Sequence, residues 1–369
     1  MKPSCAPPSS CRGIALIMVL MVVAVLTGMA GIFAYNMKVE VKLARNASFE
    51  TELEWLGRSG VEVGKFILGL RTGQSAAAGY DALNQAWAGG IGETNEIALE
   101  WLGRWVPLGE GEFKVEIEDM DRRLNINSCN IPSPEGEAIL RQAMVLVGID
   151  ASLTPTVVNS ILDWMDVDKN SRPGGAETDF YQSLTPPGRA KNAPIDDITE
   201  LLLINGVRDE PAMYWGSGGP PARRQPRSAR QSQFEERVYD TGLRDLFCAV
   251  SSGRINVNTA KPMVLQLIPG VDELKAQELV DYRSGLDHIE GTEDDVPFKS
   301  DAEIAAFLGR GVPIQSPFMR FLGVRSRVFQ IRVFTRIGTV KRTYVAYVQR
   351  GLGFGGQNFS TLNLLWEDQ

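Results

Sequence analysis

An uncharged apolar run near the N-terminus constrains this 369-residue chain more than any other feature. Residues 14–35 read IALIMVLMVVAVLTGMAGIFAY, 22 residues without a charged side chain. A helix of about 20 apolar residues crosses the roughly 30 Å hydrocarbon core of a bilayer. The run therefore predicts a single transmembrane helix. Lys2 and Arg12 lie before it and favour a cytoplasmic N-terminus and an exported body.

Three kinds of N-terminal segment could contain this run. A secretory signal peptide has a shorter apolar core and a small-residue cleavage site after it, so the length argues against that interpretation. A plain signal anchor remains open. In the third kind, the dipeptide Arg12-Gly13 directly before the run resembles the prepilin-peptidase site of type IV pilins and pseudopilins. This resemblance implies that residues 1–13 are a leader, that the peptidase cleaves after Gly13, and that the mature, methylated chain begins at Ile14.

The helical pattern continues beyond the membrane segment. Up to about residue 70, apolar residues recur at helical spacing with mostly polar or small residues between them. These apolar positions are Val39, Leu43, Phe49, Leu53, Leu56, Val63, Ile67 and Leu70. A membrane helix that continues as an amphipathic helix resembles the spine of pilins, whose outer half packs on a sheet.

The fifth residue of the predicted mature chain is Met18. Most pilins and pseudopilins carry a glutamate at this place, where it is thought to offset the N-terminal amine of an adjacent subunit. A charge without a partner in apolar surroundings is costly. A subunit without the carboxylate therefore suits the first position of a filament. Within the family, this absence resembles the K-type minor pseudopilins of type II secretion (general secretion pathway protein K).

Strand patterns lie on both sides of a long helical segment. Residues 112–126 begin with the alternation of a half-buried strand, residues 324–338 and 341–351 read as a hairpin, and residues 361–368 could add a strand. We therefore expect an α+β fold in which the pilin-like helix packs on an antiparallel sheet.

This arrangement predicts a divided domain. Residues 36–128 and 316–369 form its two parts, and residues 129–315 form a large, mostly helical insert. Residues 216–237 are rich in Gly, Pro, Arg, Ser and Gln and predict a mobile loop within the insert.

The insert contains an imperfect repeat. Each copy begins with Arg-Leu/Ile-Asn-Ile/Val-Asn, at residues 123–127 and 254–258, and continues through two helical patterns to acidic residues. Each is followed by a similar segment, APIDDITELLLING at 193–206 and VPFKSDAEIAAFLG at 296–309. These correspondences predict a duplication, and the resemblance to K-type pseudopilins implies helical repeats of this kind.

The second copy also resembles the helix-hairpin-helix motif of DNA-uptake proteins. It raises an alternative function, a membrane-tethered DNA-binding protein of a competence-type system. In that motif a Gly-x-Gly hairpin brings backbone N–H groups to a phosphate. Here Gly270 is followed by Val271, Asp272 and Glu273, so carboxylates stand where the phosphate would lie. Because the net charge is also −7, the sequence predicts no nucleic-acid partner.

The rare residues argue against an enzyme. His288 is the only histidine, so a histidine-based catalytic group with an orienting partner cannot easily form. Cys5 and Cys11 lie in the predicted leader. Cys129 and Cys248 fit one disulfide in an oxidising compartment, with two buried free thiols as the other interpretation.

The best candidate site is an acidic run after the first copy. Oxygen-bearing residues stand at the first, third, fifth and twelfth positions of a calcium loop, and a further carboxylate follows. These residues are Asp166, Asp168, Asn170, Glu177 and Asp179. Ser171 occupies the place of the usual turn glycine, which departs from an EF-hand. Hard oxygen ligands nevertheless suit Ca²⁺ better than a transition metal.

A second acidic turn follows the second copy and could form another calcium site, with an ordinary solvated loop as the other interpretation. Its carboxylates are Asp287, Glu290, Glu293, Asp294 and Asp295. The resemblance to K-type pseudopilins, whose inserted domain is associated with calcium, supports both turns.

The same resemblance implies a role in protein secretion. It implies that the chain is a single-pass inner-membrane protein with a periplasmic body at the tip of a pseudopilus. The implied partners are the I- and J-type minor pseudopilins, the major pseudopilin, the inner-membrane assembly platform, prepilin peptidase and exported substrates.

Overall fold

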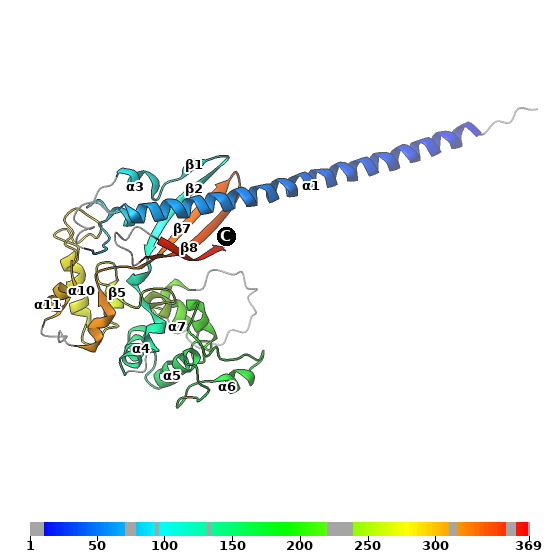
Figure 1. Cartoon of the computed structure of the whole chain (residues 1–369). Helices are drawn as coiled ribbons and strands as arrows, with labels where there is room; N and C mark the ends of the chain where they lie inside the picture. The colour runs from blue at the N-terminus through cyan, green and yellow to red at the C-terminus, as the bar shows by residue number, and fades with distance from the viewer. Residues whose placement is uncertain are drawn as a thin grey trace, which may run out of the picture.

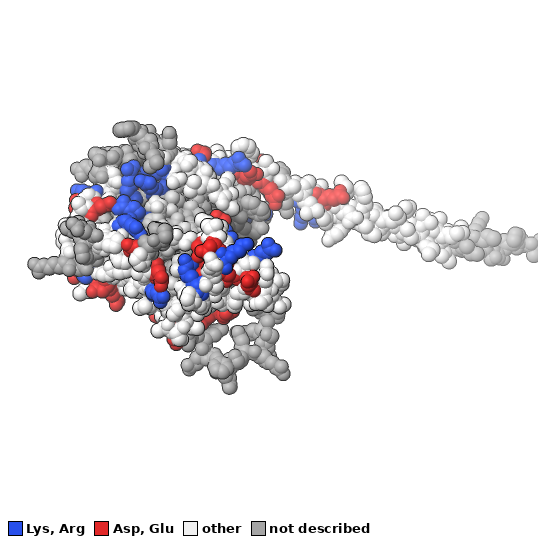
Figure 2. Space-filling view, turned by 60° about the horizontal axis from the view of Figure 1, so that its bottom comes forward, with Lys and Arg blue, Asp and Glu red and all other residues white. Residues whose placement is uncertain are grey.

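One long helix, α1 (Cys11–Gly69), forms an arm, and a body in two parts packs around its C-terminal end (Figure 1). The computed structural model describes residues 11–70, 79–92, 96–130, 134–219, 239–309, 316–351 and 359–367. Most of the predicted leader, residues 1–10, lies outside the described residues. The stretch of α1 that projects from the body carries few charges along its length (Figure 2), and its composition and length suffice to cross a membrane.

The C-terminal half of α1 packs on an antiparallel sheet. Leu53, Leu56 and Leu68 are fully or almost fully buried there. Val39 and Leu43 continue the same apolar pattern but are exposed, because the sheet covers only the later turns of the helix. The predicted helix and its division into a free half and a packed half are therefore confirmed.

The sheet has five strands in the order β1-β2-β7-β8-β9, and every neighbouring pair is antiparallel. Their bounds are β1 Val106–Leu108, β2 Gly111–Asp119, β7 Val328–Ile337, β8 Val340–Arg350 and β9 Phe359–Glu367. Along the chain, η1 (Ala86–Ala88) and α3 (Glu96–Trp101) come between α1 and β1. The predicted hairpin is β7–β8, and the predicted additional strand is β9.

Three glycines bring α1 close to the sheet. Gly57, Gly60 and Gly64 are spaced as neighbours on one helix face. A Cβ added to Gly60 would lie 2.4 Å from Val333 Cγ1, and one added to Gly64 would lie 2.7 Å from Ile331 Cγ2. The glycines therefore accommodate the side chains of the sheet. The apolar spacing revealed this face of the helix but not its close approach.

The insert occupies the connection between two neighbouring strands. The chain leaves the sheet at Asp119, the end of β2, and returns at Val328, the start of β7. Asp119 pairs with Phe329, so both ends of the insert lie side by side. Residues 120–327 thus connect the strands and reach closer to the sheet on both sides than the predicted 129–315.

Short helices are the main regular elements of the insert, which also has short parallel strand pairs β3–β4 and β5–β6. Its first elements are η2 Met120–Arg122, β3 Leu124–Asn125, η3 Ile126–Cys129, α4 Pro134–Val147, α5 Thr154–Met165, α6 Thr178–Gln182, η4 Ile198–Leu203, α7 Ala212–Trp215 and η5 Gly216–Gly218. The rest are α8 Leu243–Leu246, β4 Phe247–Cys248, β5 Ile255–Asn256, α9 Pro262–Leu265, α10 Glu273–Arg283, α11 Asp301–Leu308, η6 Pro317–Phe321 and β6 Leu322–Gly323. The loop predicted at 216–237 begins with η5, and residues 220–238 lie outside the described residues.

Matching contacts support the predicted duplication. In the first copy the Asn127 amide bonds both backbone groups of Ile195, with N···O distances of 2.9 and 2.7 Å. In the second copy the Asn258 amide bonds both backbone groups of Phe298 at 2.9 and 2.8 Å. The second asparagine of each motif therefore fastens the segment that follows the acidic turn.

The predicted disulfide between Cys129 and Cys248 is not formed. Both residues are buried free thiols. The residue opposite Cys248 in the β3–β4 ladder is Asn125, and the Cys248 sulfur lies 3.5 Å from the carbonyl oxygen of Met120. Burial raises the pKa of both thiols to about 12, so they stay neutral.

A buried polar cluster joins the two parts of the body. The Arg350 guanidinium donates to both Asp81 oxygens at 2.8 and 3.0 Å. Asp119 accepts from Thr259 Oγ1 at 2.5 Å and from Ser326 Oγ at 2.6 Å. Burial, reinforced by a neighbouring carboxylate, raises the pKa of Asp119 to about 7. The cluster thus bonds the end of β2 to Thr259 and Ser326 of the insert. It also bonds the end of β8 to Asp81, which lies between α1 and η1 along the chain.

Candidate metal centre

The first acidic turn connects α5 to α6 and bends back on itself. Asp166 ends α5 with an extended backbone. Glu177 caps α6, where its carboxylate accepts a hydrogen bond from the Thr178 backbone N–H. The two helix ends therefore bring the first and last predicted ligands of the loop together.

This turn gathers three of the five predicted ligands. The ligand oxygens of Asp166, Asp168 and Glu177 all lie within 4.8 Å of one another. Asn170 lies in the turn, and its backbone N–H donates to Asp168 Oδ1 at 2.7 Å. Asp179 lies in the first turn of α6, outside this group.

Three buried oxygens at the turn support a fit to a cation. Asp166 Oδ1, Glu177 Oε1 and Asn192 Oδ1 have no hydrogen-bond partner among the described residues. A buried acceptor left in this way costs about 1–3 kcal/mol. Carboxylate and amide oxygens at such distances are ligands that Ca²⁺ accepts. The donor set therefore fits a hard divalent cation.

Asn192 is a candidate ligand that the sequence did not reveal. Its amide nitrogen donates to Glu177 Oε2 at 3.2 Å and to the Asp168 carbonyl oxygen. Its φ of 49° places it in the left-handed region, which asparagine tolerates better than most residues. It lies fifteen residues after Glu177, on the returning segment, so no loop spacing could have predicted it.

Asp163 of α5 fixes the conformation of the first acidic turn through its bonds to Arg172. It is fully buried in α5 and accepts from the Arg172 backbone N–H at 3.1 Å. Arg172 Nη1 lies 3.1 Å from Asp163 Oδ1 and 2.5 Å from Asp166 Oδ2. Burial raises the pKa of Asp163, while the bonds from Arg172 lower it. Arg172 therefore engages one oxygen of Asp166 and leaves the other directed to the candidate centre.

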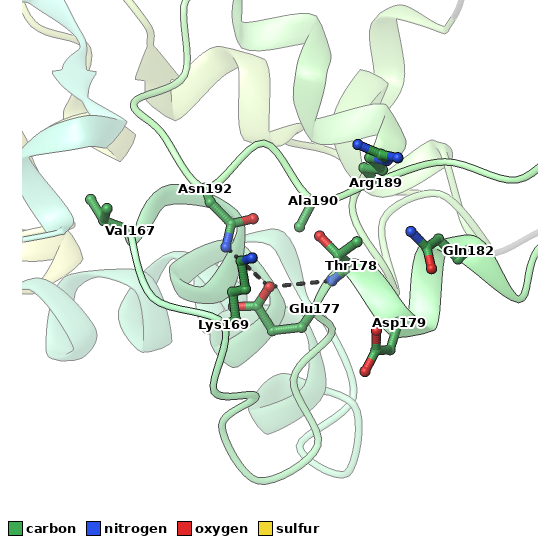
Figure 3. A pocket seen from close by; sticks show the side chains of 9 residues that line it. All are labelled: Val167, Lys169, Glu177, Thr178, Asp179, Gln182, Arg189, Ala190 and Asn192. Carbon is green, nitrogen blue, oxygen red and sulfur yellow. Dashed lines mark hydrogen bonds between the residues drawn. The ribbon is translucent and has the colours of Figure 1, made fainter.

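A hollow of about 540 Å³ borders the candidate centre. Lys169, Glu177 and Asn192 line it on one side, and Asp179 and Arg189 on the other (Figure 3). Figure 3 shows Asn192 and Glu177 directed toward each other across the turn. A cation held by these residues would thus be accessible from the hollow.

The second acidic turn is arranged differently. None of its five predicted ligands belongs to a group of three clustered metal-ligand residues within the described parts of the chain. Asp294 accepts from the backbone N–H groups of Leu286 and Asp287 at 2.7 and 3.1 Å. Glu290 pairs with buried Arg283, whose Nε lies 2.8 Å from Oε1. The turn is thus closed by internal bonds.

Several other predicted positions can also be located. Gly13 and Ile14 lie within the first turns of α1. Met18 lies on its projecting stretch and is exposed. Asp272 caps α10 and accepts from the Lys275 backbone N–H at 2.9 Å. The carboxylate therefore occupies the helix end that a phosphate would need.

Comparison with protein families gives a match within the insert. Residues 122–213 match the family model described as "Type II secretion system (T2SS), protein K". This range includes the first copy of the repeat and the candidate metal centre.

Similar proteins extend the likeness over most of the chain. Type II secretion system protein K of Pseudomonas aeruginosa is 23% identical over 347 residues, which cover 92% of this chain and 89% of that protein. The protein of the same name in Aeromonas hydrophila is 22% identical and covers 93% and 95%. A solved structure of the GspK-GspI-GspJ complex from enterotoxigenic Escherichia coli contains a chain of the same fold. It has a TM-score of 0.61 and 19% identity, and the match covers 88% of this chain and 99% of that chain.

Proposed function

Because the chain belongs to the protein K family of type II secretion systems, we propose that it acts as a minor pseudopilin that starts and caps a periplasmic pseudopilus. The observation that carries this function is the helix α1, whose apolar N-terminal stretch projects and whose C-terminal half packs on an antiparallel sheet with a large insert between β2 and β7. The role is structural, with no catalytic step. Neither the described structure nor the comparisons support the DNA-binding alternative.

The position at the tip follows from two features. Met18 offers no carboxylate to the amine of another subunit, so the chain is a poor repeating unit. The insert also adds bulk beside the sheet (Figure 1). Subunits stacked on every side would have to make room for it. A first position requires neighbours on one side only.

The proposed partners are the I- and J-type minor pseudopilins, by analogy with the relative solved as a GspK-GspI-GspJ complex. Trp55 and Phe66 of α1 are exposed and offer apolar surface to neighbouring helices. We extend the proposal to the major pseudopilin, the inner-membrane assembly platform and exported proteins. The chain would lie in the bacterial inner membrane with its N-terminus cytoplasmic and its body periplasmic.

Co-expression tests this function. With prepilin peptidase and the I- and J-type subunits in the same cells, we expect a chain that begins at Ile14 and co-purifies with both subunits from detergent extracts. Intact mass and subunit composition are the measurements. A chain without added peptidase is the control and should begin at Met1. A start at Met1 in both samples, or a processed chain that purifies alone, would contradict the proposal.

We also propose that the first acidic turn binds Ca²⁺ through Asp166, Asp168, Glu177 and Asn192. A bound cation would satisfy the three buried oxygens and fix a turn that buries little apolar surface. It would stabilise the insert by about 2.7 kcal/mol at a concentration 100 times its dissociation constant. The chain's own residues would hold the ion, while Asp163 and Arg172 position the loop.

Glu177→Gln is expected to weaken Ca²⁺ binding about tenfold or more, since it removes a charged ligand. Isothermal titration with CaCl₂ measures the affinity, and thermal unfolding with and without EGTA measures the linked stability. Glu293→Gln in the second acidic turn is the matched control and should leave both unchanged. Equal effects of the two variants would show that this assignment of the first turn is wrong.

A further inference from the structure

Three carboxylates and one guanidinium are buried together where the insert joins the sheet. We call them the joint cluster, and their residues are 0–4% exposed: Asp81, Asp119, Asp121 and Arg350. Arg350 forms its ion pair with Asp81. Within the described parts of the chain, no cation pairs with the other two carboxylates. A buried carboxylate without a counter-charge takes up a proton more readily than it stays ionised.

The hydrogen-bond partners favour Asp119 as the holder of this proton. Asp121 accepts from two backbone N–H groups, both at 2.6 Å, and such a group can only donate. Asp119 Oδ2 instead meets the hydroxyls of Thr259 and Ser326 at 2.5 and 2.6 Å. A hydroxyl can also accept a hydrogen bond, so it can receive one from a protonated carboxyl. Thr259 Oγ1 lies 3.4 Å from the carbonyl oxygen of Asn256, to which it can then turn its own hydrogen.

The charged groups around Asp119 act in the same direction. Burial and the charges of Asp121 and Asp81 together raise the pKa of Asp119 to about 7, against the lowering effect of the bonds from the two hydroxyls. Burial raises the pKa of the nearby Cys248 thiol to about 12, so it stays neutral in this range. The cations of the surrounding segments form no ion pair with Asp119, and they are exposed, half-buried or paired elsewhere: Arg122, Arg123, Arg254, Lys261, Arg283, Arg325 and Arg327.

We propose that the joint cluster binds a proton at the Asp119 carboxyl, and that this proton fastens the second copy of the repeat to the sheet. Asp119 ends β2, whereas Thr259 and Ser326 belong to the insert. When Asp119 is ionised, its charge lies beside two other buried carboxylates and weakens this attachment.

The sign of the pH dependence follows from proton binding in the two states. In the unfolded chain an aspartate loses its proton near pH 4. The folded chain keeps it until the pH reaches the raised pKa of Asp119, about 7. Between these two values the folded chain binds the extra proton, so stability falls as the pH rises and levels off above the upper value. In the proposed periplasmic location, an acid medium would tighten the joint and an alkaline medium would loosen it.

Urea unfolding of the detergent-solubilised full-length chain at several pH values, in a fixed concentration of CaCl₂, tests the proposal. Above about pH 5, we expect the unfolding equilibrium constant of the natural chain to rise about tenfold per pH unit and to level off near the raised pKa of Asp119. Asp119→Asn imitates the protonated carboxyl in size and in lack of charge, so its stability should change little over the same range. His288, the only histidine, is exposed and is present in both chains, so it cannot account for a difference between them.

Glu118→Gln is the matched control. Glu118 precedes Asp119 in β2, but its side chain is 31% exposed and pairs with Arg123 at 2.6 Å. This variant removes one carboxylate from the neighbouring position and should keep the pH dependence of the natural chain. The same pH dependence in Asp119→Asn and in the natural chain would overturn the proposal.

Infrared spectroscopy of the folded natural chain gives a second measurement. The carbonyl stretch of a protonated carboxylic acid should be present at about pH 5 and lost by about pH 8. Asp119→Asn should lack the part of the band that disappears. A natural chain without this band at the lower pH, or with a stability that does not fall as the pH rises, would overturn the proposal even if Asp119→Asn failed to fold.

Discussion

Arg350→Met is expected to lower the free energy of unfolding by about 3–5 kcal/mol, because it leaves a buried carboxylate without its counter-charge. The side chains of Asp81 and Arg350 are 0% and 2% exposed, so water cannot replace the guanidinium. Arg350 also lies over the ring of Phe329 at 5.0 Å from its centroid. Urea unfolding of the detergent-solubilised chain, followed by tryptophan fluorescence, measures the loss.

Arg336→Met is the matched control for this prediction. Arg336 pairs with Glu112 at 2.8 Å on the same sheet, but these side chains are 37% and 39% exposed. An exposed pair contributes about 0–1 kcal/mol. The two variants remove the same charge and differ in the burial of its partner. Similar losses from both would contradict the importance assigned to the buried pair.

Gly60→Ala is expected to destabilise the chain by about 1–3 kcal/mol, although alanine is the better helix former. Its Cβ would lie 2.4 Å from Val333 Cγ1, so α1 must move away from β7 or the valine must leave its rotamer. The gain in helix propensity, about 0.5–1 kcal/mol, is smaller than this cost. Thermal unfolding with far-ultraviolet circular dichroism measures the change.

Gly69→Ala on the same helix separates the two effects. Within the described parts of the chain, no atom lies within 4 Å of a Cβ placed there, so only the propensity should change. We expect stability equal to or slightly above that of the natural chain. A gain at Gly60 as well would mean that the helix is not packed closely against the sheet.

Periodic patterns in the sequence predicted the helix and the strands whose buried side chains recur at regular spacing. The apolar spacing of α1 indicated the face that lies on the sheet, and the alternation of residues 324–351 indicated β7 and β8. The repeated Arg-Leu/Ile-Asn-Ile/Val-Asn motif indicated two copies. The structure adds the reason for its second asparagine, which fastens Ile195 in one copy and Phe298 in the other.

Contacts between distant segments could not be predicted from one sequence. Asn192 reaches the first acidic turn only because the chain returns beside it. The sequence offered both acidic turns as calcium sites, although only the first has the spacing of a calcium loop. Buried Arg283 closes the second turn through Glu290, whereas the first turn retains buried oxygens to which no described residue donates a hydrogen bond. The predicted disulfide was wrong for the same reason, because Asn125 and not Cys129 lies opposite Cys248 in the β3–β4 ladder.

The side-by-side ends of the insert have a mechanical consequence. A pull on the insert away from the sheet is applied at one end of two antiparallel neighbours, β2 and β7. In this geometry the force acts on one residue pair of the β2–β7 ladder at a time, and Asp119 and Phe329 form the first pair. The Asp119 side chain is bonded there to Thr259 and Ser326 of the insert. A push along the same line compresses the joint instead, so the molecule is built to bear thrust better than tension.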